Sequence, residues 1–163
     1  DGSGTVTLDS NFSGVLPDST PAFHLNKTSS QDIPDNTWVK ITFDTELLDT
    51  NNCVSSNRFT PTTAGKYFIY ATLTIGSVST VTNLRSSYTA IYKNGSLYTF
   101  SDNNWNGSFI FAATHHVGAI IDFNGSTDYV EVYGNGDLTT GNPRVHSSSN
   151  VQCYFGGYRL IGA

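Results

Sequence analysis

Apolar and polar residues alternate along most of this chain with a period of two. Segments rich in Val, Ile, Thr, Tyr and Phe recur between clusters of Asn, Gly, Ser and Pro, and helical periodicity is nearly absent. Side chains i and i+2 share a face of a β-strand, so this alternation is typical of strands with one buried and one solvated face. The pattern predicts an all-β protein with the architecture of a jelly roll or a large sandwich.

The segments that carry this alternation are predicted as strands. They are Ala22–Lys27, Thr37–Leu47, Arg58–Phe59, Lys66–Gly76, Ser87–Lys93, Ser96–Phe100, Phe109–Phe123, Tyr129–Tyr133 and Val151–Ile161. Asn-Gly pairs begin at Asn94, Asn106, Asn124 and Asn135, and such pairs can adopt the positive φ angles of primed hairpin turns. The segment AIYKNGSLYTF, around Asn94, is the clearest predicted hairpin.

Two predicted strands carry apolar residues on both faces. The core face of the strand Lys66–Gly76 is predicted to hold Tyr67, Ile69, Ala71, Leu73 and Ile75. Phe68 and Tyr70 point to the opposite face, and the last strand repeats this arrangement with Tyr154 and Tyr158. Contiguous aromatic residues on the outside of a sheet mark association interfaces more often than ligand pockets. We therefore predict that these four residues are buried between copies of the chain in a homo-oligomer.

Composition narrows the classes of partner. Charged residues make up 13% of the 163 residues, the net charge is -5 and the pI is 5.1. Without a stripe of Lys and Arg there is no surface for phosphate contacts, so nucleic acid is not predicted as a partner. No segment reaches the roughly 18 to 20 consecutive apolar residues that span a bilayer, so membrane insertion is not predicted either.

One domain is expected, preceded by a short lead-in. Residues 1–21 lack a sustained strand pattern and contain Pro17 and Pro21, and the sequence contains no methionine. We expect residues 1–21 to be the end of a stalk in a longer protein and residues 22–163 to form a single head domain, since a chain of this length supports one core.

Candidate catalytic and metal-binding groups are few. His115 and His116 are adjacent on a predicted strand, so their side chains point to opposite faces and cannot share a metal ion. No nucleophile, phosphate-loop or zinc motif is present, and we predict that the protein is not an enzyme. The acidic stretches Ser101–Asn104 and Gly134–Asp137 offer oxygen ligands of the type calcium prefers. Turn formation explains the same residues, so no cofactor is predicted and calcium is left open.

A polar segment with one tryptophan is the candidate ligand-binding loop. It consists of Asp102, Asn103, Asn104, Trp105 and Asn106. An exposed aromatic ring on a neutral, amide-rich surface suits sugar binding, because the ring can stack on a sugar while the amides form hydrogen bonds. The alternative is that the indole of Trp105 lies over the edge of a sheet as part of the core.

Two features of the sequence leave open whether the protein resides in an oxidising or a reducing compartment. Cys53 and Cys153 either pair with each other or remain free in the core, where free cysteines behave as small hydrophobic residues. Asn-Gly-Ser at three of the turns, together with Asn11 and Asn26, gives five N-glycosylation sequences, but turn chemistry accounts for those three.

The order of several motifs resembles the complement C1q and tumour-necrosis-factor-like family. The motifs are RFTPTTAGKYFIYATLTI, AIYKNGSLY, VGAIIDFNGSTDYVEVYGNG and CYFGGYRLIGA, and together they span roughly residues 22–163. The resemblance implies a ten-stranded jelly roll that assembles as a homotrimer in an extracellular or virion-surface location. It also implies that Phe68, Tyr70, Tyr154 and Tyr158 face the threefold axis.

The functional hypotheses follow from this resemblance and from the neutral surface. The favoured one is a trimeric head of a phage or bacterial surface fibre that binds a cell-surface receptor or glycan. One alternative is a structural domain that registers or caps a trimeric fibre, or decorates a virion, without a ligand of its own. The other is a secreted cytokine-like or complement-like ligand.

Overall fold

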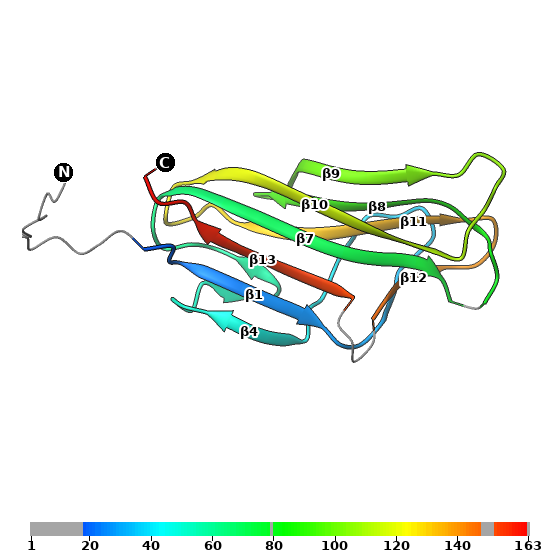
Figure 1. The fold of residues 1–163 in the computed structure, drawn as a ribbon, viewed down its shortest axis with the longest axis horizontal. Helices are drawn as coiled ribbons and strands as arrows, with labels where there is room; N and C mark the ends of the chain where they lie inside the picture. Colours follow the sequence, from blue (N-terminus) through cyan, green and yellow to red (C-terminus); the bar gives the residue numbers. More distant parts are fainter. Residues whose placement is uncertain (1–17, 79, 148–151, 163) are drawn as a thin grey trace, which may run out of the picture.

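The all-β prediction is confirmed by the computed structural model, which describes residues 18–78, 80–147 and 152–162 and contains strands without helices in these ranges. The strands form two sheets with antiparallel pairing (Figure 1). The apolar faces of the sheets meet in one core. The lead-in predicted over residues 1–21 lies mostly outside the described residues.

The first sheet, sheet A, is organised around its longest strand, β7. Its strands are β1 (Ala22–Lys27), β2 (Gln31–Asp32), β4 (Thr45–Asp49), β7 (Gly65–Ser77), β10 (Ala112–Phe123), β12 (Pro143–His146) and β13 (Cys153–Arg159). β10 pairs with one edge of β7 along nearly its full length. The other edge pairs first with β13 and then with β12, and β13 continues the sheet to β1 and β4.

The second sheet, sheet B, carries the predicted hairpin. Its strands are β3 (Val39–Lys40), β5 (Val54–Ser55), β6 (Arg58–Phe59), β8 (Leu84–Lys93), β9 (Ser96–Asn104) and β11 (Val130–Leu138). β8 and β9 are joined at Asn94 and Gly95, whose φ angles are 52° and 78°. The prediction of a primed turn at this Asn-Gly pair is confirmed, because such turns need positive φ at both central residues.

The core face predicted for β7 is confirmed. Tyr67, Ile69, Ala71, Leu73 and Ile75 are each at most 1% exposed. Aromatic rings join the two sheets beside them, since Phe23 of β1 stacks on Phe59 of β6 with 4.1 Å between centroids. Phe59 in turn contacts Tyr67 edge to face at 5.8 Å. The period-two pattern thus placed this strand correctly.

The predicted strand Thr37–Leu47 is wrong as a single element. The chain changes sheets inside it, since β3 pairs with β11 in sheet B and β4 pairs with β1 in sheet A. Ile41 and Phe43 lie in the crossing between them and are buried, so the apolar pattern continues although the strand does not.

The turn predicted at Asn135 is also wrong, because Asn135 and Gly136 lie inside β11. The glycine is required by a close approach of the backbone: a Cβ atom on Gly136 would lie 2.8 Å from the Cβ of Pro143. The predicted count of ten strands falls short of the thirteen in the described residues, four of which have two residues each.

The two ends of the sandwich differ. β1 begins and β13 ends at one end, on the left in Figure 1. The opposite end, called here the distal end, is where β7, β9 and β11 finish and where β8, β10 and β12 begin. None of the described residues forms a helix of the length and apolarity that crossing a membrane requires.

Candidate functional site

The four aromatic residues predicted for an interface lie on one face of sheet A. Strand pairing places Tyr154 opposite Thr72 and Tyr158 opposite Phe68, so their side chains share the face that points away from the core. Ring contacts connect them, with 5.9 Å between the centroids of Phe68 and Tyr158 and 6.1 Å between those of Tyr70 and Tyr154. We call this set, together with His24 of β1, the aromatic face.

His24 extends the aromatic face to a third strand. Its Nδ1 lies 3.0 Å from the hydroxyl of Tyr70, its Nε2 lies 3.0 Å from Oδ1 of Asn26, and its ring stacks on Tyr154 at 5.7 Å. Sequence reasoning missed this residue, because a lone histidine in a short strand does not reveal which neighbour it will meet.

The chemistry of the aromatic face is that of a contact surface. Phe68 and Tyr70 are partly covered by one another, and Tyr158 remains 41% exposed. Burial, followed by the nearby Tyr154 and Tyr158, raises the pKa of Tyr70, so its phenol stays neutral. A hollow of about 350 Å³ opens between β7, β10 and β13, lined by Phe68, Tyr70, Ala71, Thr72, His116, Val117, Gly118 and Tyr154. Such a hollow can receive an apolar side chain.

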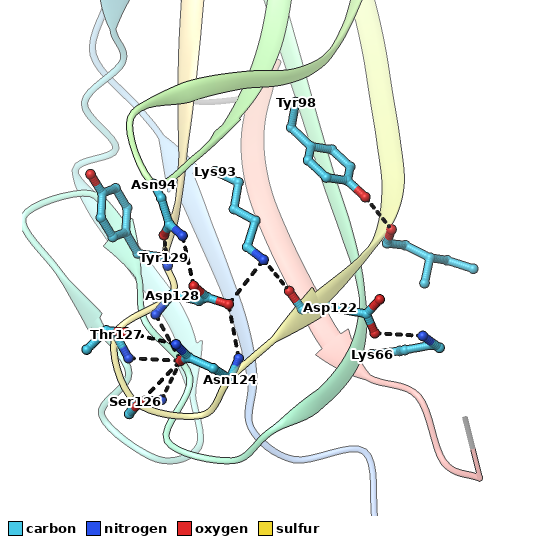
Figure 2. A network of polar contacts seen from close by, with 11 residues as sticks. Lys66, Lys93, Asn94, Tyr98, Asp122, Asn124, Ser126, Thr127, Asp128 and Tyr129 are labelled. Atoms are coloured by element: carbon cyan, nitrogen blue, oxygen red, sulfur yellow. Dashed lines mark hydrogen bonds and ion pairs between the residues drawn. The ribbon is translucent and has the colours of Figure 1, made fainter.

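A second apolar surface runs along the edge where β9 of sheet B meets β10 of sheet A. Leu97, Tyr98 and Phe100 on β9 and Ile120 on β10 are between 48% and 57% exposed. The hydroxyl of Tyr98 donates to the carbonyl of Ile120 at 3.1 Å and so connects the two sheets (Figure 2). We call these four residues the edge surface. The sequence indicated a strand here but not that it would be an edge strand.

A polar network fixes the hairpin that begins β9 (Figure 2). The ammonium group of Lys93 donates to the carbonyl of Asp122 at 2.7 Å and pairs with Asp128 at 3.1 Å. The side chain of Asn94 donates to Asp128 at 2.8 Å and accepts from the backbone of Tyr129 at 2.9 Å. These contacts hold the hairpin against the loop between β10 and β11. They therefore fix the position of the first residues of β9, where the edge surface begins.

The candidate ligand-binding loop lies at the distal end, but it begins later than predicted. Asp102, Asn103 and Asn104 belong to β9, where they pair with β8, and only Trp105 and Asn106 follow the strand. The ladder extends because polar residues are tolerated on an exposed edge strand. The backbone of Trp105 donates to the carbonyl of Arg85 at 2.8 Å, and its side chain is partly exposed.

The side chains of this segment are free to meet a ligand. Asp102, Asn103, Asn104 and Asn106 are exposed, and their side chains make no hydrogen bond within the described residues. Asn94, in contrast, uses its amide within the network of Figure 2. The structure therefore brings the predicted loop residues to one distal edge, while their role in binding stays a prediction.

The predicted histidine faces are confirmed. His115 is 2% exposed and lies in the core, whereas His116 is exposed and contacts Thr72 at 2.8 Å on the aromatic face. The Nε2 of His115 lies 2.6 Å from the hydroxyl of Ser87, which is itself fully buried. Within the described residues the Nδ1 of His115 has no partner, so this pair lacks both solvent access and an orienting carboxylate.

The stretches considered for calcium do not form acidic loops. Gly134–Asp137 lies within β11, and Asp137 pairs with Arg85 at 2.8 Å. Among the described residues, no three His, Cys, Asp or Glu side chains gather closely enough to hold a metal ion.

Both cysteines are buried free thiols with different neighbours. The thiol of Cys53 lies 3.7 Å from the carbonyl of Asn51, and that of Cys153 donates to the carbonyl of His146 at 3.0 Å. Burial raises the pKa of the Cys153 thiol, which keeps it protonated and unreactive. Of the two alternatives, the structure has the free form.

The five glycosylation sequences differ in how accessible their asparagine side chains are to solvent. Asn26 is 8% exposed, and the amides of Asn94 and Asn124 donate within the polar network. Asn106 is exposed without a side-chain hydrogen bond among the described residues, and Asn11 lies outside them. Access therefore favours Asn106, which follows Trp105 at the distal end.

Comparison by sequence finds no relative, whereas comparison by structure does. Neither a protein-family model nor a curated protein sequence matches the chain. The globular domain of zebrafish complement 1qA has a TM-score of 0.61 and 13% identity, over 86% of this chain and 98% of that one. Murine APRIL at pH 8.0 has a TM-score of 0.60 and 10% identity, over 85% of this chain and 98% of that one. The Eiger TNF of S. frugiperda has a TM-score of 0.63 and 8% identity, over 87% of this chain and 93% of that one.

These matches cover most of each chain, and their identities are low enough that they bear on the fold alone. They agree with the order of motifs in the sequence, which resembled the same group. The chain has the jelly-roll fold of complement C1q and TNF-type head domains.

Proposed function

We propose that this protein is a homotrimeric recognition head that binds a cell-surface receptor or glycan at its distal end. The aromatic face is the observation that carries the proposal. It places five aromatic or imidazole rings on the outside of sheet A, and Phe68, Tyr70 and Tyr158 remain in contact with solvent in a single chain. Soluble monomers rarely leave such a patch uncovered.

The edge surface is the proposed partner of the aromatic face. Both surfaces are apolar, and the ion pair of Lys66 with Asp122 lies at one margin of the aromatic face, consistent with the depletion of charge at interface centres. Contact between two different surfaces is heterologous and closes into a ring when the rotation permits. A threefold ring, as the resemblance implies, would cover both surfaces in every copy.

Recognition is assigned to the distal end. Trp105 and Asn106 lie there, opposite the end at which β1 begins, together with the exposed side chains of Asp102 and Asn104. A trimer carries three copies of this site on one rigid body, so weak individual contacts combine into higher avidity. An amide-rich segment beside an aromatic ring is suited to a glycan or a glycosylated receptor.

Two biological settings use the same arrangement. A phage or bacterial fibre head would bind a host surface, whereas a secreted ligand would bind an animal receptor, and the zebrafish complement and murine APRIL folds favour considering the second. The secreted form predicts a disulfide and occupied sequons, but both cysteines are free here. Intact mass under non-reducing conditions separates the two settings by measuring bridge and glycans together.

The proposal is tested in two stages. Sedimentation velocity of the unchanged chain at micromolar concentration is expected to give the mass of a trimer, and a stable monomer would overturn the assembly. Trp105→Ala and Asn104→Ala are then expected to keep the trimer and to reduce binding to cells or to a glycan array at least tenfold. If binding is undiminished in both variants, the assignment to this loop is wrong. If the trimer binds no cell or glycan, the protein is a structural cap.

A further inference from the structure

A hollow of about 380 Å³ lies at the distal end, separate from the candidate loop. It is lined by Asp32, Ser77, Val78, Val81, Asn83, Leu138, Thr140, Gly141 and Asn142. These residues come from the ends of β2, β7 and β11 and from the two connections β7–β8 and β11–β12. Ligand pockets commonly have volumes of about 300 to 1,000 Å³, so this hollow is at the small end of that range.

Asn83 lines this hollow with a buried side-chain amide, of which only the NH2 group forms a hydrogen bond among the described residues. It is 6% exposed, and its Nδ2 donates to the carbonyl of Thr140 at 2.9 Å. The backbone carbonyl of Asn83 accepts from Thr139 at 3.0 Å, so two contacts fix its position. Its Oδ1 has no hydrogen-bond partner among the described residues. This oxygen is enclosed by protein atoms, so Asn83 acts as a fixed part of the wall and not as an acceptor for a ligand.

Another lining residue, Asn142, is held by Asp35 and keeps a free donor. The Oδ1 of Asn142 accepts from the backbone of Asp35 at 3.3 Å, and the carboxylate of Asp35 accepts from the backbone of Leu138 at 2.8 Å. The Nδ2 of Asn142 makes no hydrogen bond within the described residues. This amide therefore presents a donor whose orientation is set by the contact on its other side.

The charge and the apolar part of the lining select the ligand. Asp32 is the one charged side chain of the lining, and it pairs with Arg144 at 2.5 Å. Without a lysine or arginine in the lining, a phosphate or carboxylate finds no counter-charge and meets a carboxylate instead. Val78 and Val81 are 45% and 52% exposed, so they offer C–H surface beside the amides.

We propose that this hollow binds a neutral saccharide. Sugar hydroxyls can accept from the Nδ2 of Asn142 and donate to the carboxylate of Asp32, while the C–H face of a pyranose ring packs on the two valines. A ligand of one or two sugar rings suits the volume. This inference rests on the proposed recognition function and names a second contact and the ligand class: neutral sugars, which the hollow holds together with the Trp105 segment.

The test uses an array of neutral and sialylated glycans, followed by titration of the free sugar that binds. Val81→Glu places a carboxylate at the mouth of the hollow, and Asn142→Asp keeps the acceptor for Asp35 while removing the donor. Each is expected to weaken neutral-glycan binding at least tenfold. Thr82→Glu is the matched control, because Thr82 is exposed in the same connection but does not line the hollow. It should bind like the unchanged chain.

The outcomes separate this inference from the broader proposal. If Trp105→Ala abolishes glycan binding and Val81→Glu does not, the recognition head stands and the hollow is not its site. Selective binding of sialylated glycans would overturn the neutral class. If a correctly assembled trimer binds cells but no glycan on the array, recognition stands and the saccharide inference fails. If it binds neither, both fail.

Discussion

The hydroxyl of Tyr70 lies 3.0 Å from Nδ1 of His24, although β7 and β1 are separated by β13. Gly156 of β13 lies in register between them, and Tyr154 flanks the pair, with its ring 5.7 Å from His24 and 6.1 Å from Tyr70. The glycine at 156 makes this possible, since a Cβ there would lie 2.4 Å from the Tyr70 hydroxyl. The aromatic face is thus one connected surface across three strands.

Replacing Tyr70 should separate its apolar role from its hydrogen bond. Tyr70→Asp is expected to give monomer or insoluble protein, because a carboxylate would be buried between subunits without a partner. Tyr70→Phe removes the hydroxyl contact with His24 and keeps the ring, so the trimer should persist with a modest loss of stability of about 1 kcal/mol. Sedimentation velocity and circular dichroism measure assembly and folding. An intact trimer of Tyr70→Asp would show that this face is not the interface.

The proposed contact between face and edge predicts a specific result on mixing. Tyr98→Asp disrupts the edge surface and leaves the aromatic face intact, whereas Tyr70→Asp does the reverse. Each variant alone should be monomeric, but a mixture should form a heterodimer through the one intact face and the one intact edge. Sedimentation of the equimolar mixture measures this. A face-to-face contact would give no heterodimer and would contradict the heterologous arrangement.

Tyr67 should make the fold sensitive to alkaline pH. Burial raises its pKa to about 12 from 10.0, so the folded chain holds this proton where the unfolded chain releases it. The stabilisation that this raised pKa contributes is fully present below pH 10 and is lost as the pH rises through 12. The difference of roughly 2 in pKa corresponds to about 3 kcal/mol in the free energy of unfolding.

Tyr67→Phe removes this dependence. The variant loses the hydrogen bond from the phenol to the carbonyl of Thr63, 2.7 Å long, at a cost of about 1 kcal/mol near neutral pH. Urea unfolding from pH 7 to 11 should show the unchanged chain losing stability more steeply than the variant. Parallel curves would contradict the assignment to Tyr67.

Glu131 should make the stability of the fold depend on pH in the acidic range. Its burial raises the pKa of the carboxyl, but Lys40 at 2.7 Å and Arg58 at 2.9 Å outweigh burial and hold the pKa below the ordinary 4.5. A lowered pKa means that this stabilisation is present above pH 4.5 and is lost as the pH falls. Glu131→Gln should cost about 1 to 3 kcal/mol at pH 7, less than a fully buried pair, because both cations are partly exposed.

Urea unfolding at pH 7 and pH 3 tests this expectation. The difference in stability between Glu131→Gln and the unchanged chain should be smaller at pH 3 than at pH 7, because the stabilisation from a lowered pKa is lost as the pH falls below 4.5. Asp122→Asn is a matched control, since its pair with Lys66 is exposed and should contribute little at either pH. An equal difference at both pH values would contradict an ionic role for Glu131.

The alternation along β7 determined which residues fill the core and which form the aromatic face. Side chains two apart must share a face, so the placement of Tyr67 against Phe68 and Tyr70 follows from the sequence without knowledge of any partner strand. The hairpin at Asn94 was determined in the same way, because its Asn-Gly pair has a local conformational preference.

Features that depend on strand order were decided by the tertiary structure alone. The sequence placed Asn135 in a turn, but the close packing of Gly136 against Pro143 keeps both residues in a strand. His24 joins Tyr70 only because β13 lies between β1 and β7, and Tyr98 meets Ile120 only because β9, at the edge of sheet B, lies beside β10, at the edge of sheet A. The hollow around Asn83 likewise needs distant segments to converge. Period and turn chemistry are local properties of the chain, whereas these contacts arise from pairings between segments far apart in it.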